Sequence, residues 1–401
     1  MNILFLTLVE IDDIDRQGIY TDLLREFVSH RDCVYVLSAN EKRNNTPTHL
    51  IDKGQCKILR VQTGNIQKTN KIEKGISTIT LEKKYLSAIK KYFNEVTFDL
   101  VLYSTPPITF YKVIKYIKNK DMAKSYLLLK DIFPQNAVDI GMMRKNGPIY
   151  KFFRSMEKRL YSISDFIGCM SPANAKYVIV HNPSLNPDII HVNPNSVAPI
   201  LNSISIEEKN RIRDNFGLPK DKRIFIYGGN LGKPQDIPFI IECLKTQMVK
   251  ADRFFLISGS GTEYPVIEQF FDSEKPNNMK LMNTLPRDEY SNLVSACDVG
   301  MIFLDYRFTI PNFPSRLLSY MEASIPVLAC TDPNTDIGCT IVDGKFGWHC
   351  ISDNVQLFKE TVDEICSLPD LSKHGKSARK YLNEHYLASD SYKTILDQLG
   401  L

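Results

Sequence analysis

Short, unbroken apolar runs recur along the whole chain, and they limit the possible folds more than any other feature of the sequence. Apolar and polar residues do not alternate within these runs, which is the pattern of strands buried on both faces, as in a parallel sheet. Helix-like stretches such as Thr21–His30, Thr80–Phe93 and Pro107–Lys118 lie between the runs, so the sequence predicts repeated βαβ units. The expected strands are Ile3–Leu8, Val34–Leu37, Leu100–Tyr103, Tyr126–Leu129, Phe166–Met170, Ile224–Tyr227, Phe254–Ile257, Val299–Leu304 and Pro326–Ala329.

The alternation of strand and helix is interrupted once, in residues 181–203. This segment holds four prolines and five asparagines, which stop any long element. We therefore expect an interdomain hinge centred near residues 195–203, with an N-terminal domain over residues 1–198 and a second domain over residues 199–385. The predicted fold class is α/β, with two Rossmann-like parallel-sheet domains facing a central cleft that binds ligands at the carboxyl ends of the strands.

The composition narrows the class of protein. Hydrophobic residues make up 43% of the chain and charged residues 24%, which excludes a disordered or fibrous chain. The nine cysteines form no CxxC pair, so zinc ribbons and thioredoxin-like motifs are disfavoured and a reducing cytoplasm is expected. The start of the chain is not a signal peptide, and no apolar run approaches the length of about 18 residues that spans a bilayer.

Charge is distributed unevenly along the chain. Residues 1–200 hold 28 Lys and Arg against 19 Asp and Glu, a balance of +9, and the remainder holds 22 against 27, a balance of −5. A basic half suggests that this half faces an anionic surface. Nucleic acid is disfavoured because no binding motif occurs, which favours a membrane surface. Within residues 149–163 an apolar stripe is predicted to be buried, while the cations beside it are expected to face lipid headgroups.

Two glycine turns follow strands in the second half. The first, Gly228–Lys233, would let backbone N–H groups approach an anion, and Lys233 would add a full charge. The alternative is a tight turn with a solvated lysine. The second turn, Gly259-Ser260-Gly261, precedes Glu263, which is placed either to pair with ribose hydroxyls or to cap the next helix, and a purely structural turn is an equal alternative.

Residues 310–332 contain the strongest local signal for a binding site. Pro314 and Ser315 predict a helix start in which the serine hydroxyl satisfies free N–H groups. Arg316 then lies in the first turn, where a cation opposes the helix dipole. That position is favourable if an anion such as a diphosphate occupies the site; a surface arginine paired with an acid is the alternative.

The segments GNLGK, GSG and PSRLLSYMEASIPVLA together resemble the donor domain of the retaining glycosyltransferases of family 4. In the first half, Gly18-Ile19-Tyr20 before a helix resembles the family's glycine loop near the donor phosphates, and residues 127–141 resemble the segment where a histidine–aspartate pair borders the acceptor site. The resemblance covers nearly the whole chain. It implies the GT-B fold, a nucleotide-sugar donor, no metal or other cofactor, and a C-terminal helix over residues 386–401 that returns to the N-terminal domain.

The chain departs from the family pattern at several positions. The family's two donor-site glutamates, eight positions apart, fall on Pro311 and Ser319, with Glu322 one turn further on as a partial replacement. The family's histidine falls on Lys130, beside a retained Asp131. The expected catalytic residues are Asp131, Lys130 and Arg316, and the expected donor-binding residues are Gly18, Gly229, Asn230, Lys233, Gly259, Ser260, Leu285, Pro314, Ser315, Leu317 and Ser319.

The resemblance is closest to bacterial enzymes of surface-polysaccharide and O-antigen synthesis. It implies transfer of a sugar, with retention, to a saccharide acceptor carried on a polyprenyl diphosphate, by a cytoplasmic protein at the inner face of the cell membrane. Two alternatives remain open. The missing glutamates are compatible with a non-catalytic nucleotide-sugar-binding subunit, and sugar-nucleotide epimerases also use paired Rossmann-like domains.

Overall fold

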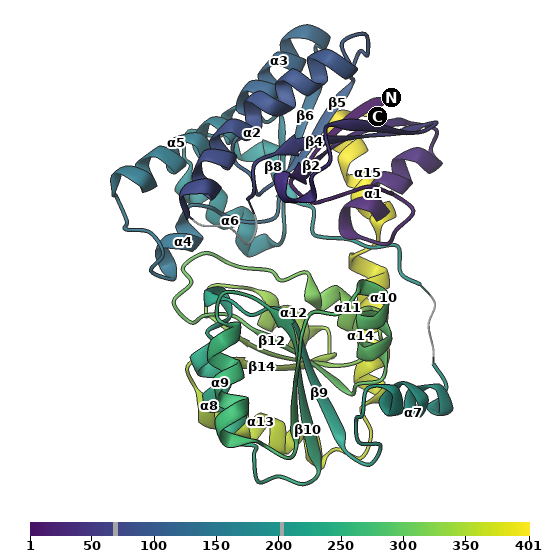
Figure 1. Ribbon diagram of the computed structural model, residues 1–401, viewed down its shortest axis with the longest axis vertical. Coiled ribbons are helices and arrows are strands. Elements are labelled where there is room, and N and C mark those ends of the chain that lie inside the picture. Colours follow the sequence, from purple (N-terminus) through teal and green to yellow (C-terminus); the bar gives the residue numbers. More distant parts are fainter. Residues whose placement is uncertain (67–70, 201–203) are drawn as a thin grey trace. The chain divides into compact units, whose positions relative to one another are not determined.

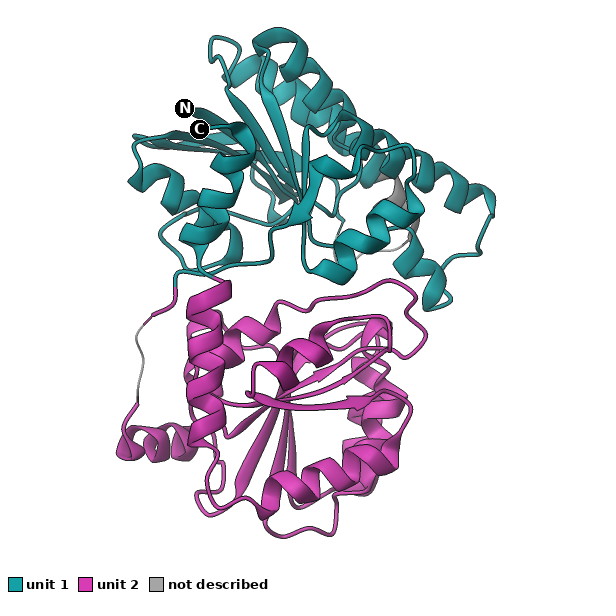
Figure 2. Ribbon diagram, turned by 180° about the vertical axis from the view of Figure 1, so that it is seen from behind, with its two compact units in different colours: residues 1–198, 387–401 teal, residues 199–386 magenta. Residues whose placement is uncertain are grey.

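The computed structural model describes residues 1–66, 71–200 and 204–401. The chain divides into two compact units: unit 1 contains Met1–Ala198 together with Leu387–Leu401, and unit 2 contains Pro199–Tyr386 (Figure 2). The second boundary expected from the sequence lies one residue earlier. Of the expected hinge, residues 201–203 lie outside the described residues.

Unit 1 is built on an eight-stranded sheet in the order β3-β4-β2-β1-β5-β6-β7-β8 (Figure 1). Neighbouring strands are parallel except for β3 and β4, which pair antiparallel at one edge, so this sheet is mixed rather than purely parallel as predicted. The strand order reverses between β1 and β5. The strands are β1 (Asn2–Leu6), β2 (Cys33–Glu41), β3 (His49–Lys53), β4 (Cys56–Thr63), β5 (Leu100–Ser104), β6 (Lys124–Leu129), β7 (Phe166–Cys169) and β8 (Ile190–Val192).

The helices of unit 1 include the last helix of the chain. Figure 1 shows α15 beside α1, and the ring of Tyr392 on α15 meets the ring of Phe27 on α1 edge-on at 4.9 Å. The Ala388 N–H also donates to the Val197 carbonyl at 2.9 Å, which ties the C-terminal segment to unit 1. The helices are α1 (Ile19–Ser29), α2 (Lys71–Tyr92), α3 (Tyr111–Asp121), α4 (Gln135–Asp139), α5 (Pro148–Ile163), α6 (Pro172–His181) and α15 (Ala388–Leu399), with short 3₁₀ turns at Lys42–Asn44 and Pro187–Ile189.

Unit 2 is built on a six-stranded parallel sheet in the order β11-β10-β9-β12-β13-β14. The order reverses between β9 and β12, which makes this pair the switch point of the sheet. At such a point the carboxyl ends of parallel strands form a ligand-binding crevice. The strands are β9 (Arg223–Asn230), β10 (Arg253–Ser260), β11 (Met279–Met282), β12 (Val299–Phe303), β13 (Val327–Thr331) and β14 (Gly347–Ile351).

Helices cover both faces of the second sheet. Apolar side chains of α8, α9 and α13 pack with alternate strand residues such as Phe225, Phe255 and Phe303 into one continuous core. Burial on both faces explains the unbroken apolar runs of the sequence. The helices of unit 2 are α7 (Ile206–Asn215), α8 (Ile237–Lys245), α9 (Tyr264–Glu274), α10 (Arg287–Ser295), α11 (Arg316–Glu322), α12 (Ile337–Asp343), α13 (Val355–Ser367) and α14 (Ser372–His385), with a 3₁₀ turn at Lys233–Gln235.

Most expected elements are present, with three corrections. Every predicted strand coincides with an observed one, whereas β3, β4, β8, β11 and β14 were not predicted. Helix α3 begins at Tyr111, so the predicted start at Pro107 is wrong. The prediction that the apolar stripe of residues 149–163 is buried is wrong for Ile149 and Phe152, which are exposed. The buried residues of α5 are Glu157, Leu160 and Tyr161, because the helix packs through its second half.

Candidate functional site

The glycines at the ends of β9 and β10 allow the two strand ends to pack where there is no space for a side chain. Gly229 has φ +122°, a backbone conformation that a side chain would strain. Gly259 pairs with Gly229 across the sheet, and a Cβ atom on Gly259 would lie 2.0 Å from the Gly229 carbonyl oxygen. A Cβ on Gly261 would lie 2.1 Å from the Leu231 carbonyl oxygen. Gly259 and Gly261 thus serve backbone packing, and Gly229, which is exposed, is the glycine that presents its backbone at the switch point.

Arg316 extends from the start of α11 to this glycine turn. The Arg316 guanidinium carbon lies 4.4 Å from the centre of the Tyr227 ring, and its atoms lie 3.7 Å from the position of a Cβ on Gly229. Within the described residues, the Arg316 Nη1 is buried and has no hydrogen-bond partner. A buried, charged donor without a partner is destabilising, so this atom is ready to bind an anion.

Two tyrosines that the sequence analysis did not select complete this part of the site. The Tyr227 hydroxyl donates to the Asn230 carbonyl at 2.6 Å and so holds the glycine turn, while its ring stacks on Arg316. Tyr290 on α10 fills the space beside Gly228, and its hydroxyl is buried without a hydrogen-bond partner in the described part of the chain. The only sequence signal for Tyr227 is its place two residues before Gly229.

The start of α11 differs from the expectation. Ser315 does not cap the helix with its side chain, because its own φ of −64° and ψ of −18° are already helical. Its hydroxyl is instead exposed. Leu317 is fully buried and its N–H donates to the Pro314 carbonyl at 3.3 Å, so Leu317 is a core residue. Ser319 is half-buried on the same helix, one turn before Glu322.

The turn after β9 is held by a side-chain network. Asn230 donates through Nδ2 to the Gln235 Oε1 at 2.8 Å, and the Gly232 N–H donates to the same oxygen at 3.3 Å. Lys233 is exposed at the start of its 3₁₀ turn. Ser260 is half-buried at the end of β10, and Leu285 is half-buried in the segment between β11 and α10.

In unit 1, Gly18 stands at the start of α1 and is tied to Asp22. The Gly18 N–H donates to the Asp22 Oδ1 at 2.8 Å, and Arg25 donates to the same atom at 2.6 Å. The Ala198 N–H donates to the other carboxylate oxygen at 2.8 Å. Gly18 has an extended backbone, with φ 175°, that any residue can adopt. The helix predicted after Gly18 is present as α1, and the buried carboxylate of Asp22 fixes the turn that precedes it.

Lys130 and Asp131 lie where β6 ends, beside the end of β5. The Thr105 hydroxyl accepts from the backbone N–H of Lys130 at 3.0 Å and donates to the Asp131 carbonyl at 3.1 Å. Lys130 Nζ donates to the Asn193 carbonyl at 3.3 Å, and burial lowers the pKa of Lys130 to about 7. Burial raises the pKa of Asp131 to about 6, opposed by Asn136, which donates to both carboxylate oxygens at 2.9 Å. Both groups therefore titrate near neutral pH, as acid–base groups do.

The lowered pKa of Lys130 predicts a specific pH dependence of stability. The unfolded chain binds the lysine proton below its usual pKa of 10.5, whereas the folded chain binds it only below about 7. The contribution of Lys130 to the free energy of unfolding therefore falls as pH drops from about 10.5 to about 7, and it is constant below that range.

Urea unfolding of wild type and Lys130→Met at pH 7 and pH 10 checks this prediction. Lys130→Met should gain stability relative to wild type at pH 7 and lose most of that advantage at pH 10. Lys124→Met is the matched control, since Lys124 is exposed at the start of β6, the strand that Lys130 follows. An equal stability difference at both pH values would contradict the lowered pKa.

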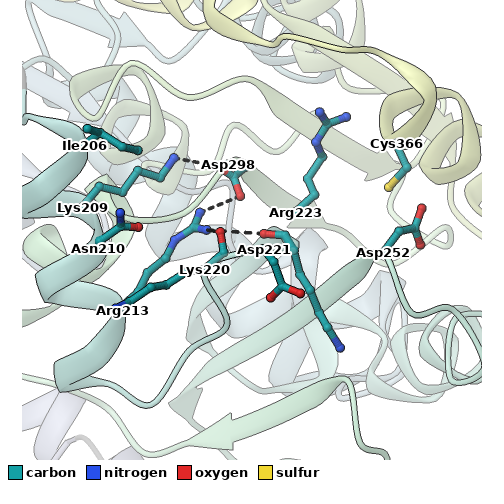
Figure 3. Close-up of a pocket in the computed structure, with 11 residues that line it drawn as sticks. Ile206, Lys209, Asn210, Arg213, Lys220, Asp221, Arg223, Asp252, Asp298 and Cys366 are labelled. Carbon is teal, nitrogen blue, oxygen red and sulfur yellow. Dashed lines mark hydrogen bonds and ion pairs between the residues drawn. The ribbon is translucent and has the colours of Figure 1, made fainter.

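A cavity of about 380 Å³ lies at the opposite end of the second sheet (Figure 3). It is lined by residues from α7 and from the amino ends of the strands. Three of its charged groups pair with one another: Lys209 and Arg213 each bind Asp298, at 2.6 and 2.8 Å, and Asp298 accepts from the Ile224 N–H at 2.7 Å. These contacts anchor α7 to the sheet, so this cavity is not the candidate site.

Two further features concern metals and membranes. Among the residues that the structure describes, no three His, Cys, Asp or Glu side chains are grouped as a metal ion requires. No helix in the same residues is both long enough and apolar enough to cross a bilayer.

Comparison with known proteins supports the fold and relates the second unit to a known family. Residues 208–381, which lie within unit 2, match the model of the family of group 1 glycosyl transferases. The chain is 26% identical, over 80% of its length and 78% of the relative's, to the probable glycosyltransferase WbjE of Pseudomonas aeruginosa. A second relative, the alpha-monoglucosyldiacylglycerol synthase of Acholeplasma laidlawii, is 26% identical over 47% of each chain.

Solved structures agree over the whole chain. Sucrose-phosphate synthase of Thermosynechococcus elongatus superposes with a TM-score of 0.73 at 15% identity, covering 99% of this chain and 98% of that one. Anabaena Alr3699/HepE in complex with UDP superposes with a TM-score of 0.68 at 13% identity, covering both chains completely. The fold is therefore GT-B, with two α/β units, as the sequence analysis predicted.

Proposed function

We propose that the chain is a retaining glycosyltransferase of family 4, which moves a sugar from a nucleotide-sugar donor to a saccharide acceptor without a metal ion. The main support is Arg316, whose buried Nη1 has no hydrogen-bond partner in the described residues and lies at the switch point of a glycosyl transferase group 1 domain. The UDP bound by Alr3699/HepE and the UDP-glucose bound in a further structure of that protein support a nucleotide-sugar donor.

The proposed mechanism uses charge stabilisation. As the bond between the sugar and the donor diphosphate breaks, negative charge builds on the leaving phosphate. Arg316, held against the Tyr227 ring, supplies a fixed cation for that charge, and the Tyr290 hydroxyl supplies a second buried donor nearby. Such preorganised donors lower the barrier because they need no reorientation during the reaction. Asp131 and Lys130 of unit 1 orient the acceptor hydroxyl or the donor sugar.

The acceptor is proposed to be a saccharide carried on a polyprenyl diphosphate, at the inner face of a bacterial cell membrane. WbjE, a probable glycosyltransferase of a bacterium, supports sugar transfer in a bacterial cell, and the second relative is named for a glycosylated diacylglycerol, which is a lipid. The balance of +9 in residues 1–200 favours an anionic membrane surface on this half of the chain.

A thermal-shift panel of nucleotides and nucleotide sugars, in EDTA and in Mg²⁺, tests the donor site. A ligand at about 100 times its dissociation constant should stabilise the fold by about 2.7 kcal/mol. We expect one nucleotide to shift the melting temperature equally in EDTA and in Mg²⁺, followed by sugar transfer to a lipid-linked acceptor.

The other outcomes separate the alternatives. No shift with any nucleotide would contradict the donor site. A shift without turnover, together with co-purification of a second transferase, would favour a binding subunit, in which Pro311 and Ser319 replace the family's glutamates. Conversion of the donor without any acceptor would indicate an epimerase.

A further inference from the structure

The segment joining α4 to α5 combines exposed apolar side chains with cations. Residues 140–156 contain no Asp or Glu and four basic residues. Three large apolar side chains of this segment are exposed: Ile149 by 62%, Met142 by 59% and Phe152 by 46%. We call these three residues, together with the exposed cations Arg144, Lys145 and Lys151, the α4–α5 patch.

The patch is exposed because unit 1 covers only the second half of α5. Helix α5 packs on unit 1 through Leu160 and Tyr161 in its second half, while Figure 1 shows its first half and the α4–α5 connection at the outer edge of the unit, away from α1 and α15. Phe153 anchors the base of the patch, with its ring edge-on to Phe133 at 5.1 Å. Phe152 and Ile149 therefore project from a fixed support. Apolar side chains clustered at a surface mark an interaction site.

Helix α4, which directly precedes this segment, contacts the acceptor-side residue Asp131. Asp131 accepts two hydrogen bonds from Asn136 on α4, and the Tyr150 hydroxyl on α5 donates to the Gln135 Oε1 at 3.4 Å. Contacts within unit 1 thus link the α4–α5 patch to Asp131.

We propose that the α4–α5 patch inserts Met142, Ile149 and Phe152 into the headgroup region of an anionic lipid bilayer. The charge of the patch indicates that its binding partner is anionic. Arg144, Lys145 and Lys151 surround the apolar tips and no acid interrupts residues 140–156, so the patch is complementary to an acidic lipid surface. The proposal rests on the proposed function in one respect: docking brings a lipid-linked acceptor to Asp131.

Co-sedimentation with vesicles tests the patch without reference to activity. Wild type should bind vesicles of equal parts phosphatidylcholine and phosphatidylglycerol, and bind phosphatidylcholine vesicles much less. The double variant Ile149→Ser/Phe152→Ser should bind the anionic vesicles at least about tenfold more weakly, because two apolar side chains no longer leave water. Lys145→Glu/Lys151→Glu should weaken binding by at least about 25-fold, since the loss of each cation costs about fivefold and the new carboxylates are repelled by anionic lipid.

Matched controls separate the patch from general effects. Met122→Ser/Val249→Ser removes two apolar side chains that are also exposed, and Lys373→Glu/Lys376→Glu reverses two exposed lysines of unit 2; both should bind as wild type does. All four variants should keep the wild-type melting temperature and the wild-type shift with nucleotide. If no nucleotide shifts the melting temperature of the wild type, the proposed function is contradicted, whereas the vesicle result still tests the patch.

Three results would overturn the proposal. Failure of the wild type to bind anionic vesicles would contradict it directly. Unchanged binding by both patch variants would place the membrane surface elsewhere. A wild-type dimer that Ile149→Ser/Phe152→Ser converts to a monomer, without vesicle binding, would assign the patch to a second copy of this chain.

Discussion

Replacement of Arg316 by Ala is expected to lower kcat for sugar transfer by about 10²–10³-fold, the usual loss when one charge-stabilising donor is removed. The guanidinium lies over the Tyr227 ring and against Gly229, and its Nη1 is buried without a partner in the described residues. Alanine leaves this space empty, so the leaving diphosphate loses a fixed cation. Steady-state kinetics with saturating donor and acceptor measure the effect, and the thermal shift with nucleotide should shrink in parallel.

Two further variants make this result interpretable. Arg316→Lys keeps the charge but not the flat group that stacks on Tyr227, so it should recover only part of the lost activity. Arg211→Ala removes an exposed arginine of the same unit, on α7, and should leave the kinetics unchanged. Wild-type kinetics in Arg316→Ala would remove Arg316 from the mechanism.

Replacement of Gly259 by Ala is expected to destabilise unit 2 by about 3 kcal/mol, at the upper end of what overpacking usually costs. The added Cβ would lie 2.0 Å from the Gly229 carbonyl oxygen and 3.4 Å from the Leu231 side chain. Backbone atoms have little freedom to move, so the ends of β9 and β10 must separate. Because Gly229 lies against Arg316, the shift with nucleotide should fall as well.

Urea unfolding followed by circular dichroism, with and without nucleotide, measures both effects. Gly54→Ala is the control: Gly54 has φ +75° but no atom within 4 Å of the added Cβ, so it should cost only about 1 kcal/mol and leave nucleotide binding intact. If Gly259→Ala unfolds as wild type does, the close approach of the two strands is not a requirement of the fold.

The candidate site was only partly predictable. Arg316 and Gly229 are predicted from the sequence because a charge at a helix start and a glycine after a strand are visible there, whereas Lys130 is expected only from the family resemblance. Tyr227 and Tyr290 were not found, since a tyrosine within or beside an apolar run looks like any core residue. Their roles depend on which helix packs beside which strand. Leu317, which is among the expected donor-binding residues, has its side chain fully buried in the core.

The exposed start of α5 illustrates the same limit for surfaces. Helical spacing predicted one apolar stripe along residues 149–163, yet periodicity shows only that a face exists, not how much of it has a partner. Unit 1 covers the second half of the helix and leaves Ile149 and Phe152 in solvent.

The sequence by itself determined the alternation of buried strands and helices, the division near residue 198, the glycine turns and the positions of the charged candidates. These depend on local composition and on short-range periodicity. Only the tertiary structure decided that Gly259 serves strand packing, that Arg316 stacks on Tyr227 without a partner for its Nη1 in the described residues, and that burial brings the pKa values of Lys130 and Asp131 to about 7 and about 6. The physical reason is that burial, stacking and desolvation are set by residues distant in the chain, which no local pattern specifies.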